Sequence, residues 1–353
     1  MTLREAGSRC RPRILYAVGL LGFLGVLATG CEPPGSGDGA TSGKAGTPAG
    51  GVEAGYLEGA RGASLHYRVL GREGRDTVVV VHGGPGAGMN SVLPDFARLS
   101  DEHVLIFYDQ RGGGRSELPA DTALLDARYF VEDLESVRRH FRLERMTILA
   151  HSFGSIVAAR YAREHPHRVD RLVFHGATGP RRSEAARIAR GAGSAPPDTG
   201  LARRARRLLG ELLDGTATDP VETCRAWEAA GRELARARGD SARWGGSVCE
   251  APARAVRYYF RHTARFAPAT FGDWDFTGGL EEVAAPLLVI WGARDSAAIP
   301  GQRAWASSVP NGRLLLLTGV GKAAIAGRPD RVKAAIDTFL GGSWPSGADA
   351  VSP

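Results

Sequence analysis

One short segment constrains the fold of this chain more than any other. The sequence AHSFG at 150–154 places Ser152 between a strand-like run, Met146–Leu149, and a helix-like run, Ser155–Glu164. A strand, a sharp turn and a helix in that order hold a serine hydroxyl clear of the backbone, and the helix points its first N–H groups toward the same place. The segment therefore predicts a nucleophile elbow, in which the serine attacks once a base takes its proton.

Apolar runs and helical patterns alternate along most of the chain, and most runs are continuous, as is typical of strands buried on both faces. Besides the strand of the elbow, the predicted strands are 65–70, 77–81, 104–108, 171–174, 287–291 and 313–317. Besides the helix of the elbow, the predicted helices are 129–141 and 331–340. This order predicts an α/β fold with a mostly parallel sheet and helices on both faces.

Residues 181–280 interrupt this alternation, because they are helical in pattern and rich in arginine. We expect them to form a helical cap inserted between two strands, so that the core comprises residues 53–180 and 281–342. The basic face of the cap is expected to be solvated, and a funnel for an anionic substrate is the alternative. Residues 343–353 are rich in Pro, Gly, Ser and Ala and are predicted to be a disordered tail.

The N-terminus has the pattern of a targeting segment. Basic residues precede an apolar run, 14–27, that is short for a membrane span. The sequence LATGC at 27–31 resembles the lipobox of bacterial lipoproteins. We therefore expect residues 1–30 to be a signal peptide, Cys31 to be lipidated, and residues 31–52 to form a flexible tether.

A lipidated Cys31 predicts a membrane-anchored lipoprotein of the cell envelope, on the outer membrane or facing the periplasm, and Glu32 favours outer-membrane sorting. A plain secretory signal and an uncleaved anchor are the alternatives. In that oxidising compartment Cys224 and Cys249 remain as a pair, because Cys10 leaves with the signal peptide. We expect them to form a disulfide, and two buried thiols are the alternative.

The net charge of +7 does not indicate a nucleic-acid partner. Residues 1–30 supply +3 of this charge, and the remaining +4 is a small excess for so long a chain. The sequence also lacks a metal-binding cluster, a phosphate-binding glycine loop and a dinucleotide fingerprint. We therefore expect no cofactor and no metal, and a small molecule or short peptide as substrate.

Two further motifs follow predicted strands. The glycines of HGGPG at 82–86 allow the backbone to approach a reacting carbonyl and to turn an N–H toward the oxyanion, although a simple tight turn would also use them. The motif DQRGGGRS at 109–116 is expected to be structural. In this interpretation Asp109 and Arg111 brace the loop at 82–86, and His82 is a hydrogen-bonding brace within it.

Together with the elbow, these motifs resemble the α/β-hydrolase fold, and within it the prolyl aminopeptidase (proline iminopeptidase)-like branch. The resemblance covers 57–179 well and 280–340 fairly, and the cap only by position. It implies that Ser152 attacks an acyl carbon while the N–H groups of Gly84 and Phe153 hold the oxyanion. It also assigns Asp295, which ends the sequence WGARD at 291–295, as the acid of a catalytic triad.

The histidine of that triad is replaced in this chain. In the family it ends a G-x-G-H sequence after the last strand, whereas the sequence GVGK at 319–322 ends in Lys322, and no histidine follows Asp295. His151, next to the serine, is expected to be structural. Because a nearby anion favours the charged form of lysine, we expect a Lys322–Asp295 ion pair that leaves Ser152 unactivated. A desolvated Lys322 that serves as the base is the alternative.

The sequence therefore predicts a serine hydrolase of the cell envelope that acts on esters or small N-terminal peptide amides, with activity weakened by Lys322. A catalytically inactive hydrolase-fold lipoprotein that binds a small ligand or peptide is the alternative. By the resemblance, a cap carboxylate would hold the free amine of a peptide substrate, and the candidates are Glu222, Glu228 and Glu250.

Overall fold

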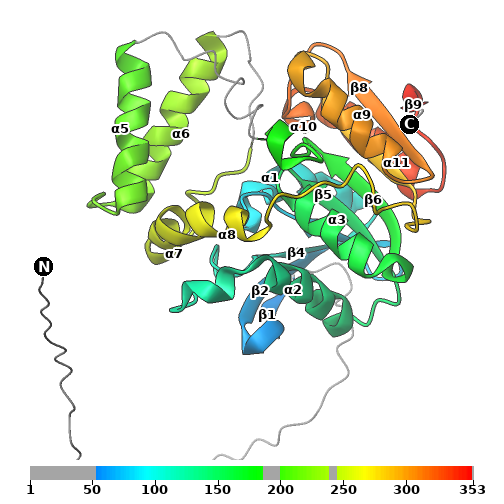
Figure 1. Ribbon diagram of the computed structural model, residues 1–353, viewed down its shortest axis with the longest axis horizontal. Coiled ribbons are helices and arrows are strands. Elements are labelled where there is room, and N and C mark those ends of the chain that lie inside the picture. The colour runs from blue at the N-terminus through cyan, green and yellow to red at the C-terminus, as the bar shows by residue number, and fades with distance from the viewer. Residues whose placement is uncertain (1–52, 186–198, 238–244, 352–353) are drawn as a thin grey trace, which may run out of the picture. The chain divides into compact units, whose positions relative to one another are not determined.

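A nine-stranded sheet forms the centre of the fold (Figure 1). In order across the sheet its strands are β1 (Glu53–Glu58), β2 (Ser64–Leu70), β4 (Val104–Tyr108), β3 (Thr77–Val81), β5 (Met146–His151), β6 (Val169–His175), β7 (Leu287–Gly292), β8 (Gly312–Leu317) and β9 (Ala348–Ala350). Strands β3 to β8 are parallel, whereas β1 and β2 at one edge and β9 at the other are antiparallel to their neighbours. The computed structural model describes residues 53–185, 199–237 and 245–351, which belong to one compact unit.

Two hydrophobic clusters cover the two faces of the sheet. Alternate residues of each central strand point to opposite faces, so Val79 and Val81 join one cluster and Val78 and Val80 the other. The first cluster contains α2 (Ala127–His140), α3 (Gly154–Glu164) and α9 (Ile299–Ser307). The second contains α1 (Leu93–Phe96), α10 (Ala324–Gly327) and α11 (Pro329–Leu340). The predicted α/β fold with helices on both faces is confirmed.

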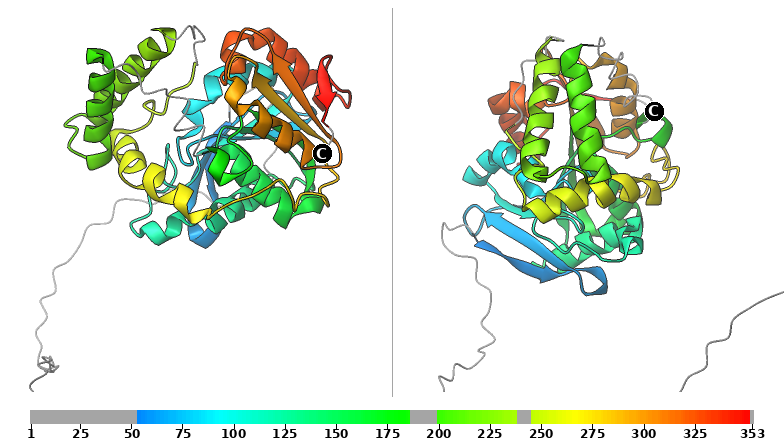
Figure 2. Two further views of the ribbon diagram at one scale, coloured as in Figure 1. Left: turned by 45° about the horizontal axis from the view of Figure 1, so that its top comes forward. Right: turned by 90° about the vertical axis from the view of Figure 1, so that its left-hand side faces the viewer.

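Between β6 and β7 the described residues include the helices α5 (Gly200–Asp214), α6 (Pro220–Ala237), α7 (Ala253–Tyr258) and α8 (Ala264–Thr270). Helices α5 and α6 pack side by side, and α7 and α8 lead back toward the sheet (Figure 2). A π-helical turn, Tyr259–Thr263, joins α7 to α8. These helices have a small hydrophobic cluster of their own, which includes the disulfide between Cys224 and Cys249.

The prediction of a disordered tail is wrong for residues 343–351. Strand β9 pairs with β8, with Asp349 opposite Leu314, and the ring of Trp344 lies 5.0 Å from that of Phe339. Pairing with β9 satisfies backbone groups that the edge strand β8 would otherwise leave open, and this outweighs the polar composition of the tail.

The signal peptide, the lipidated Cys31 and the tether predicted for residues 1–52 lie outside the described residues. Within the described ranges, no helix combines the length and apolar character needed to cross a membrane.

Candidate active site

Ser152 lies in the strained turn that the sequence predicts. Its φ angle is 52°, a left-handed conformation that costs a non-glycine residue about 1–3 kcal/mol unless its surroundings hold it in place. The N–H of Ser152 donates to the carbonyl of His175 on β6 at 3.2 Å. Gly154 leaves room for the turn, because a Cβ there would lie 2.4 Å from the carbonyl oxygen of Val81. The turn thus packs against β6 and β3, and these contacts hold Ser152 in its strained conformation.

Lys322 reaches the serine from the loop after β8. Its Nζ lies 3.0 Å from Oγ of Ser152, and its backbone N–H donates to Oδ2 of Asp295 at 2.5 Å. The structure therefore brings together the three residues predicted as nucleophile, base and acid. The predicted ion pair is wrong: among the ion pairs of the described residues, none joins Lys322 to Asp295. The carboxylate instead binds the lysine backbone, which leaves the side chain free to extend to Ser152.

The environment of the Lys322 ammonium favours its neutral form. Burial lowers the pKa of Lys322 below its ordinary value, and the negative charge of Asp295, which raises it, does not cancel that effect. Lys322 as a whole residue nevertheless remains exposed to solvent. The sequence-based expectation that the anion would dominate this pKa is thus reversed by desolvation.

The loop at 82–86 lies directly against the nucleophile. A Cβ on Gly83 would lie 3.0 Å from Cβ of Ser152 and 3.5 Å from the backbone nitrogen of Phe153. Gly84 has a φ of 116°, and a Cβ there would lie 2.6 Å from the nitrogen of Ala87. In the described part of the chain, neither the N–H of Gly84 nor that of Phe153 donates to another protein atom. Two unused donors beside Ser152 suit an oxyanion hole.

Buried side chains hold this loop from behind. Oδ1 of Asp109 accepts the N–H of Met89 at 2.6 Å, and Oδ2 accepts the N–H of Arg115 at 2.9 Å. Oε1 of Gln110 accepts the N–H of Gly86 at 3.1 Å, and its Nε2 donates to the carbonyl of His82 at 2.7 Å. Gln110 was not among the predicted site residues, although it lies within the motif at 109–116.

His82 braces the start of the loop with its ring. Its Nε2 accepts the N–H of Gln110 at 3.0 Å, so Nδ1 carries the proton and donates to the carbonyl of Gly83 at 2.8 Å. Full burial lowers the pKa of His82, which keeps this neutral tautomer in place.

Arg111 does not brace the oxyanion loop, contrary to the sequence-based interpretation. Its guanidinium binds the carboxylate of Asp133 on α2 at 2.6 and 2.7 Å, and it donates to the carbonyls of Leu124 and Ala60. Both charged groups are almost fully buried, so each compensates the buried charge of the other. Arg111 therefore ties α2 to the turn between β1 and β2, while Asp109 binds the N–H of Met89, just beyond the loop at 82–86.

A pair of neutral histidines lies beside Lys322. Nδ1 of His151 lies 3.2 Å from Nδ1 of His175 and 3.1 Å from its carbonyl oxygen, while Nε2 of His175 accepts the N–H of Ile325 at 3.1 Å. Burial first, and then the charge of Lys322, lowers the pKa of His175 to about 3. Burial first, and then the neighbouring His175, lowers the pKa of His151 well below its usual value. The bond to Ile325 fixes the segment that follows Lys322. His175 was not among the predicted site residues. It could have been identified from its position at the end of β6, the strand next to β5, where it pairs with His151.

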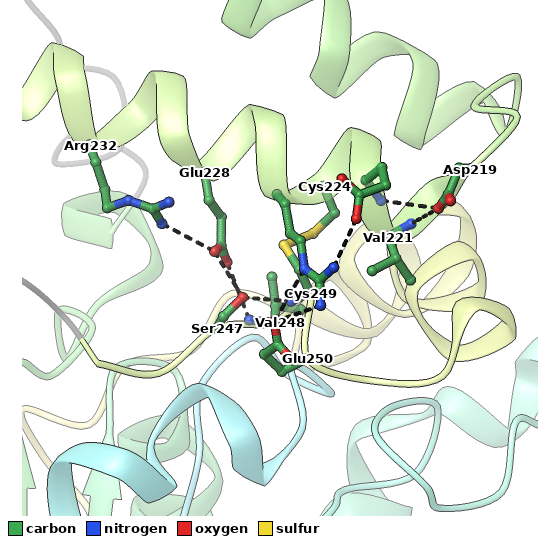
Figure 3. Close-up of a disulfide and its surroundings, with 11 residues drawn as sticks. Asp219, Val221, Cys224, Glu228, Arg232, Ser247, Val248, Cys249 and Glu250 are labelled. Atoms are coloured by element: carbon green, nitrogen blue, oxygen red, sulfur yellow. Dashed lines mark hydrogen bonds and ion pairs between the residues drawn. A yellow bond between two sulfur atoms is a disulfide. The ribbon is translucent and has the colours of Figure 1, made fainter.

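A cavity of about 370 Å³ opens over Ser152. Gly83, Gly84 and Ser152 line it from the core, and Trp227, Glu228 and Tyr259 line it from the cap. Glu228 accepts hydrogen bonds from the hydroxyl of Ser247 at 2.8 Å and from the N–H of Val248 at 3.3 Å (Figure 3).

The other two candidate cap carboxylates lie elsewhere. Glu222 and Glu250 both bind the guanidinium of Arg225, and neither lines the cavity over Ser152. Glu228 is thus the one of the three that faces the nucleophile. Among the described residues, the group able to hold a metal is Cys224, Glu228 and Cys249, but the two sulfurs are joined as a disulfide and offer no thiolate (Figure 3).

Comparison with known proteins agrees with this geometry. The family model described as "alpha/beta hydrolase fold" matches residues 76–325, and the chain belongs to this family. A proline iminopeptidase of Heyndrickxia coagulans is 36% identical over 34% of this chain and 42% of its own length. A probable proline iminopeptidase of Streptomyces coelicolor is 32% identical over 45% of this chain and 49% of its own length. The matched segments thus span less than half of these relatives, and they support the prolyl aminopeptidase-like branch.

Solved structures show the same fold over a longer stretch. A proline iminopeptidase of Mycobacterium smegmatis has a TM-score of 0.59 at 24% identity, covering 82% of this chain and 98% of the other. A proline iminopeptidase-related protein of Thermus thermophilus has a TM-score of 0.56 at 25% identity, covering 83% of this chain and 99% of the other.

Proposed function

We propose that this protein is a serine hydrolase in which Lys322 replaces histidine as the general base. The observation that carries the proposal is the 3.0 Å contact between Nζ of Lys322 and Oγ of Ser152, at a lysine whose pKa is lowered by burial. A neutral amine at this distance can accept the serine proton directly, which meets the geometric requirement for a general base.

The reaction then follows from the positions of these groups. Nζ of Lys322 takes the proton of Ser152 as Oγ bonds to the acyl carbon, and the carbonyl oxygen becomes an oxyanion facing the N–H groups of Gly84 and Phe153. When the intermediate collapses, the bond to the leaving group breaks, and the amine or alkoxide that departs takes the proton from Nζ. A water molecule then attacks the acyl carbon, again giving its proton to Lys322, which returns it to Oγ as the acid is released.

The cavity supports esters or small N-terminal peptide amides as the substrate class. Glu228, which Arg232 contacts from the same helix at 3.4 Å, offers its carboxylate to a free amine as a second cation, and Trp227 and Tyr259 offer apolar surface for a small side chain. The nearby charge of Glu228 is among the causes that raise the pKa of Tyr259 to about 12, after burial, so the phenol stays neutral. A small residue with a free amine next to the scissile bond would suit these walls.

A fluorophosphonate probe tests the nucleophile without knowledge of the substrate. We expect the wild type to be labelled and Ser152→Ala to remain unlabelled. Lys322→Met should lose labelling by about 10³-fold or more, since loss of the base is among the most damaging changes in such sites. Equal labelling of the wild type and Lys322→Met would refute the role of the lysine.

A non-catalytic binding protein is the second candidate. It is favoured by the negative charge of Asp295, which opposes the deprotonation of Lys322. In that case the ammonium donates to Ser152 and holds it inert. Lys322→His separates the two: an inert wild type that gains turnover of p-nitrophenyl esters through this change would establish the second candidate.

We also propose that the protein is anchored in the cell envelope as a lipoprotein, on the strength of the sequence around Cys31. Cells grown with a clickable palmitate analogue should label the wild type in the membrane fraction, and Cys31→Ser should be unlabelled. Retention of label by the variant would contradict the proposal.

A further inference from the structure

A second and larger cavity, of about 660 Å³, lies beside the one that contains Ser152. Ala87, which follows the loop at 82–86, lines both cavities, so the two adjoin at this residue. The other walls of the second cavity are β1 and β2, the loop after Asp109, and the cap segment that carries the disulfide. A substrate bound at Ser152 therefore has a neighbouring space into which a distal part could extend.

Among the residues that the structure describes, two arginines of this second cavity have no partner for their charge. Arg68 projects from β2 on the same side of the strand as His66, and Arg115 follows the glycines of the loop at 109–116. Within the part of the chain that the structure describes, neither guanidinium makes a hydrogen bond or an ion pair. Arg225, which also lines the cavity, is already bound by Glu222 and Glu250.

The one buried carboxylate in this wall cannot serve these arginines. Both oxygens of Asp109 are occupied, by the N–H groups of Met89 and Arg115 and by Nδ1 of His66 at 3.0 Å. Arg68 and Arg115 thus present unused donors to a cavity that adjoins the nucleophile. Arginine suits a carboxylate because its planar guanidinium can bind both oxygens.

We propose that this second cavity binds the terminal carboxylate of a short peptide whose amino end lies at Ser152. The proposal rests on the proposed function and narrows its substrate class. A free peptide carries an amine for Glu228 in one cavity and a carboxylate for Arg68 and Arg115 in the other. The enzyme would accordingly prefer short free peptides over neutral esters and over peptides whose carboxyl end is blocked.

Binding to a variant that cannot react tests this directly. Full-length Ser152→Ala would be titrated by calorimetry with Pro followed by one to four glycines, each as the free acid and as the C-terminal amide. At the length that spans the two cavities, we expect the acid to bind about 10-fold more tightly than the amide, as charge-assisted hydrogen bonds allow. Equal affinity of acid and amide at every length, or no binding of either, would overturn the proposal.

Matched variants locate the effect. Arg68→Met combined with Arg115→Met, in the Ser152→Ala background, should bind acid and amide equally, and each single change should give part of this loss. Arg72→Met, at an exposed arginine outside the cavity, should keep the full preference. A preference that survives the double change would place the carboxylate elsewhere. Preference for the acid together with failure of the wild type to react with the fluorophosphonate would leave the subsite standing and refute the proposed function.

Discussion

Nζ of Lys322 lies 3.0 Å from Oγ of Ser152, while the carboxylate of Asp295 holds the backbone rather than the side chain of the same lysine. A histidine in this position has two ring nitrogens and can bind the serine and the carboxylate at once. Lysine has a single nitrogen at the end of a longer stem. Asp295 therefore acts on the base through its charge and by positioning the main chain, and this division of roles leads to distinct predictions.

The reactivity of Ser152 should rise with pH. The pKa of Lys322 is lowered by burial from its ordinary value near 10.5, so the fraction of neutral amine grows as the pH rises through this lowered pKa. The rate of fluorophosphonate labelling, measured from pH 6 to 10, should follow that titration. Lys322→Arg should remain unreactive throughout, because a guanidinium keeps its proton across this range. A rate that is flat with pH in the wild type would contradict a lysine base.

Asp295→Asn should move this pH profile downward rather than abolish it. The charge of Asp295 raises the pKa of Lys322, so its removal lowers that pKa further and yields more neutral amine at a given pH. The asparagine keeps an oxygen that can accept the backbone N–H of Lys322. The same labelling series would measure the shift.

Asp295→Ala is the control for position, since it removes the acceptor along with the charge. It should lose rate at every pH. A large loss in Asp295→Asn with no shift of the profile would indicate that the carboxylate works as it does in a histidine triad.

The strands that could be predicted from the sequence were those that are buried on both faces, because such strands have an apolar composition. Continuous Val and Leu runs identified the central strands, because strands covered on both faces need apolar residues at every position. Strands β1 and β9 were missed, since each lies at an edge and carries polar residues that face solvent. Their place is decided by pairing with a neighbour, which composition does not encode.

The site was predictable as a set of residues but not as a set of contacts. The motifs placed Ser152, Asp295 and Lys322 together, yet whether Asp295 binds the side chain or the backbone of the lysine depends on loop geometry. The choice of Glu228 among the cap carboxylates likewise depended on how α6 packs over the core.

The disulfide should matter for both stability and substrate affinity. It closes a loop of 25 residues, and replacing Cys224 and Cys249 by serine should lower the free energy of unfolding by about 3 kcal/mol on a chain-entropy estimate. Urea unfolding monitored by tryptophan fluorescence would measure this. Because Val248, next to Cys249, binds Glu228 at 3.3 Å, the variant should also show a raised KM for peptide substrates. An unchanged KM would show that the loop holds Glu228 without the disulfide.

Gly84→Ala should disable the oxyanion hole. A Cβ at this residue would lie 2.6 Å from the nitrogen of Ala87, at a φ of 116°, so the loop must move away from its position beside Ser152. We expect kcat for p-nitrophenyl acetate to fall by about 10²–10³, as when a single oxyanion donor is lost. Gly74→Ala is a matched control, because that glycine also has a positive φ but nothing within 4 Å of its Cβ. The control should lose some stability and keep its kcat.

The buried side chain of His175 should make the protein sensitive to mild acid. The folded-state pKa of His175 is about 3, whereas the unfolded chain has a histidine pKa near 6.5. Above pH 6.5 both states are neutral and stability does not depend on this residue. As the pH falls below 6.5 the unfolded state binds the proton first, so stability declines by up to about 1.4 kcal/mol per pH unit until the folded pKa is reached.

His175→Gln removes the imidazole that binds the proton but keeps an acceptor for the N–H of Ile325, which His175 binds at 3.1 Å. Urea unfolding of the variant between pH 7 and 4.5 should therefore show a slope smaller by about one proton than the wild type. His167→Gln, at an exposed histidine, should leave the slope unchanged. Equal slopes in the wild type and His175→Gln would mean that His175 is protonated in the folded state, and a positive charge there would lower the pKa of Lys322 further.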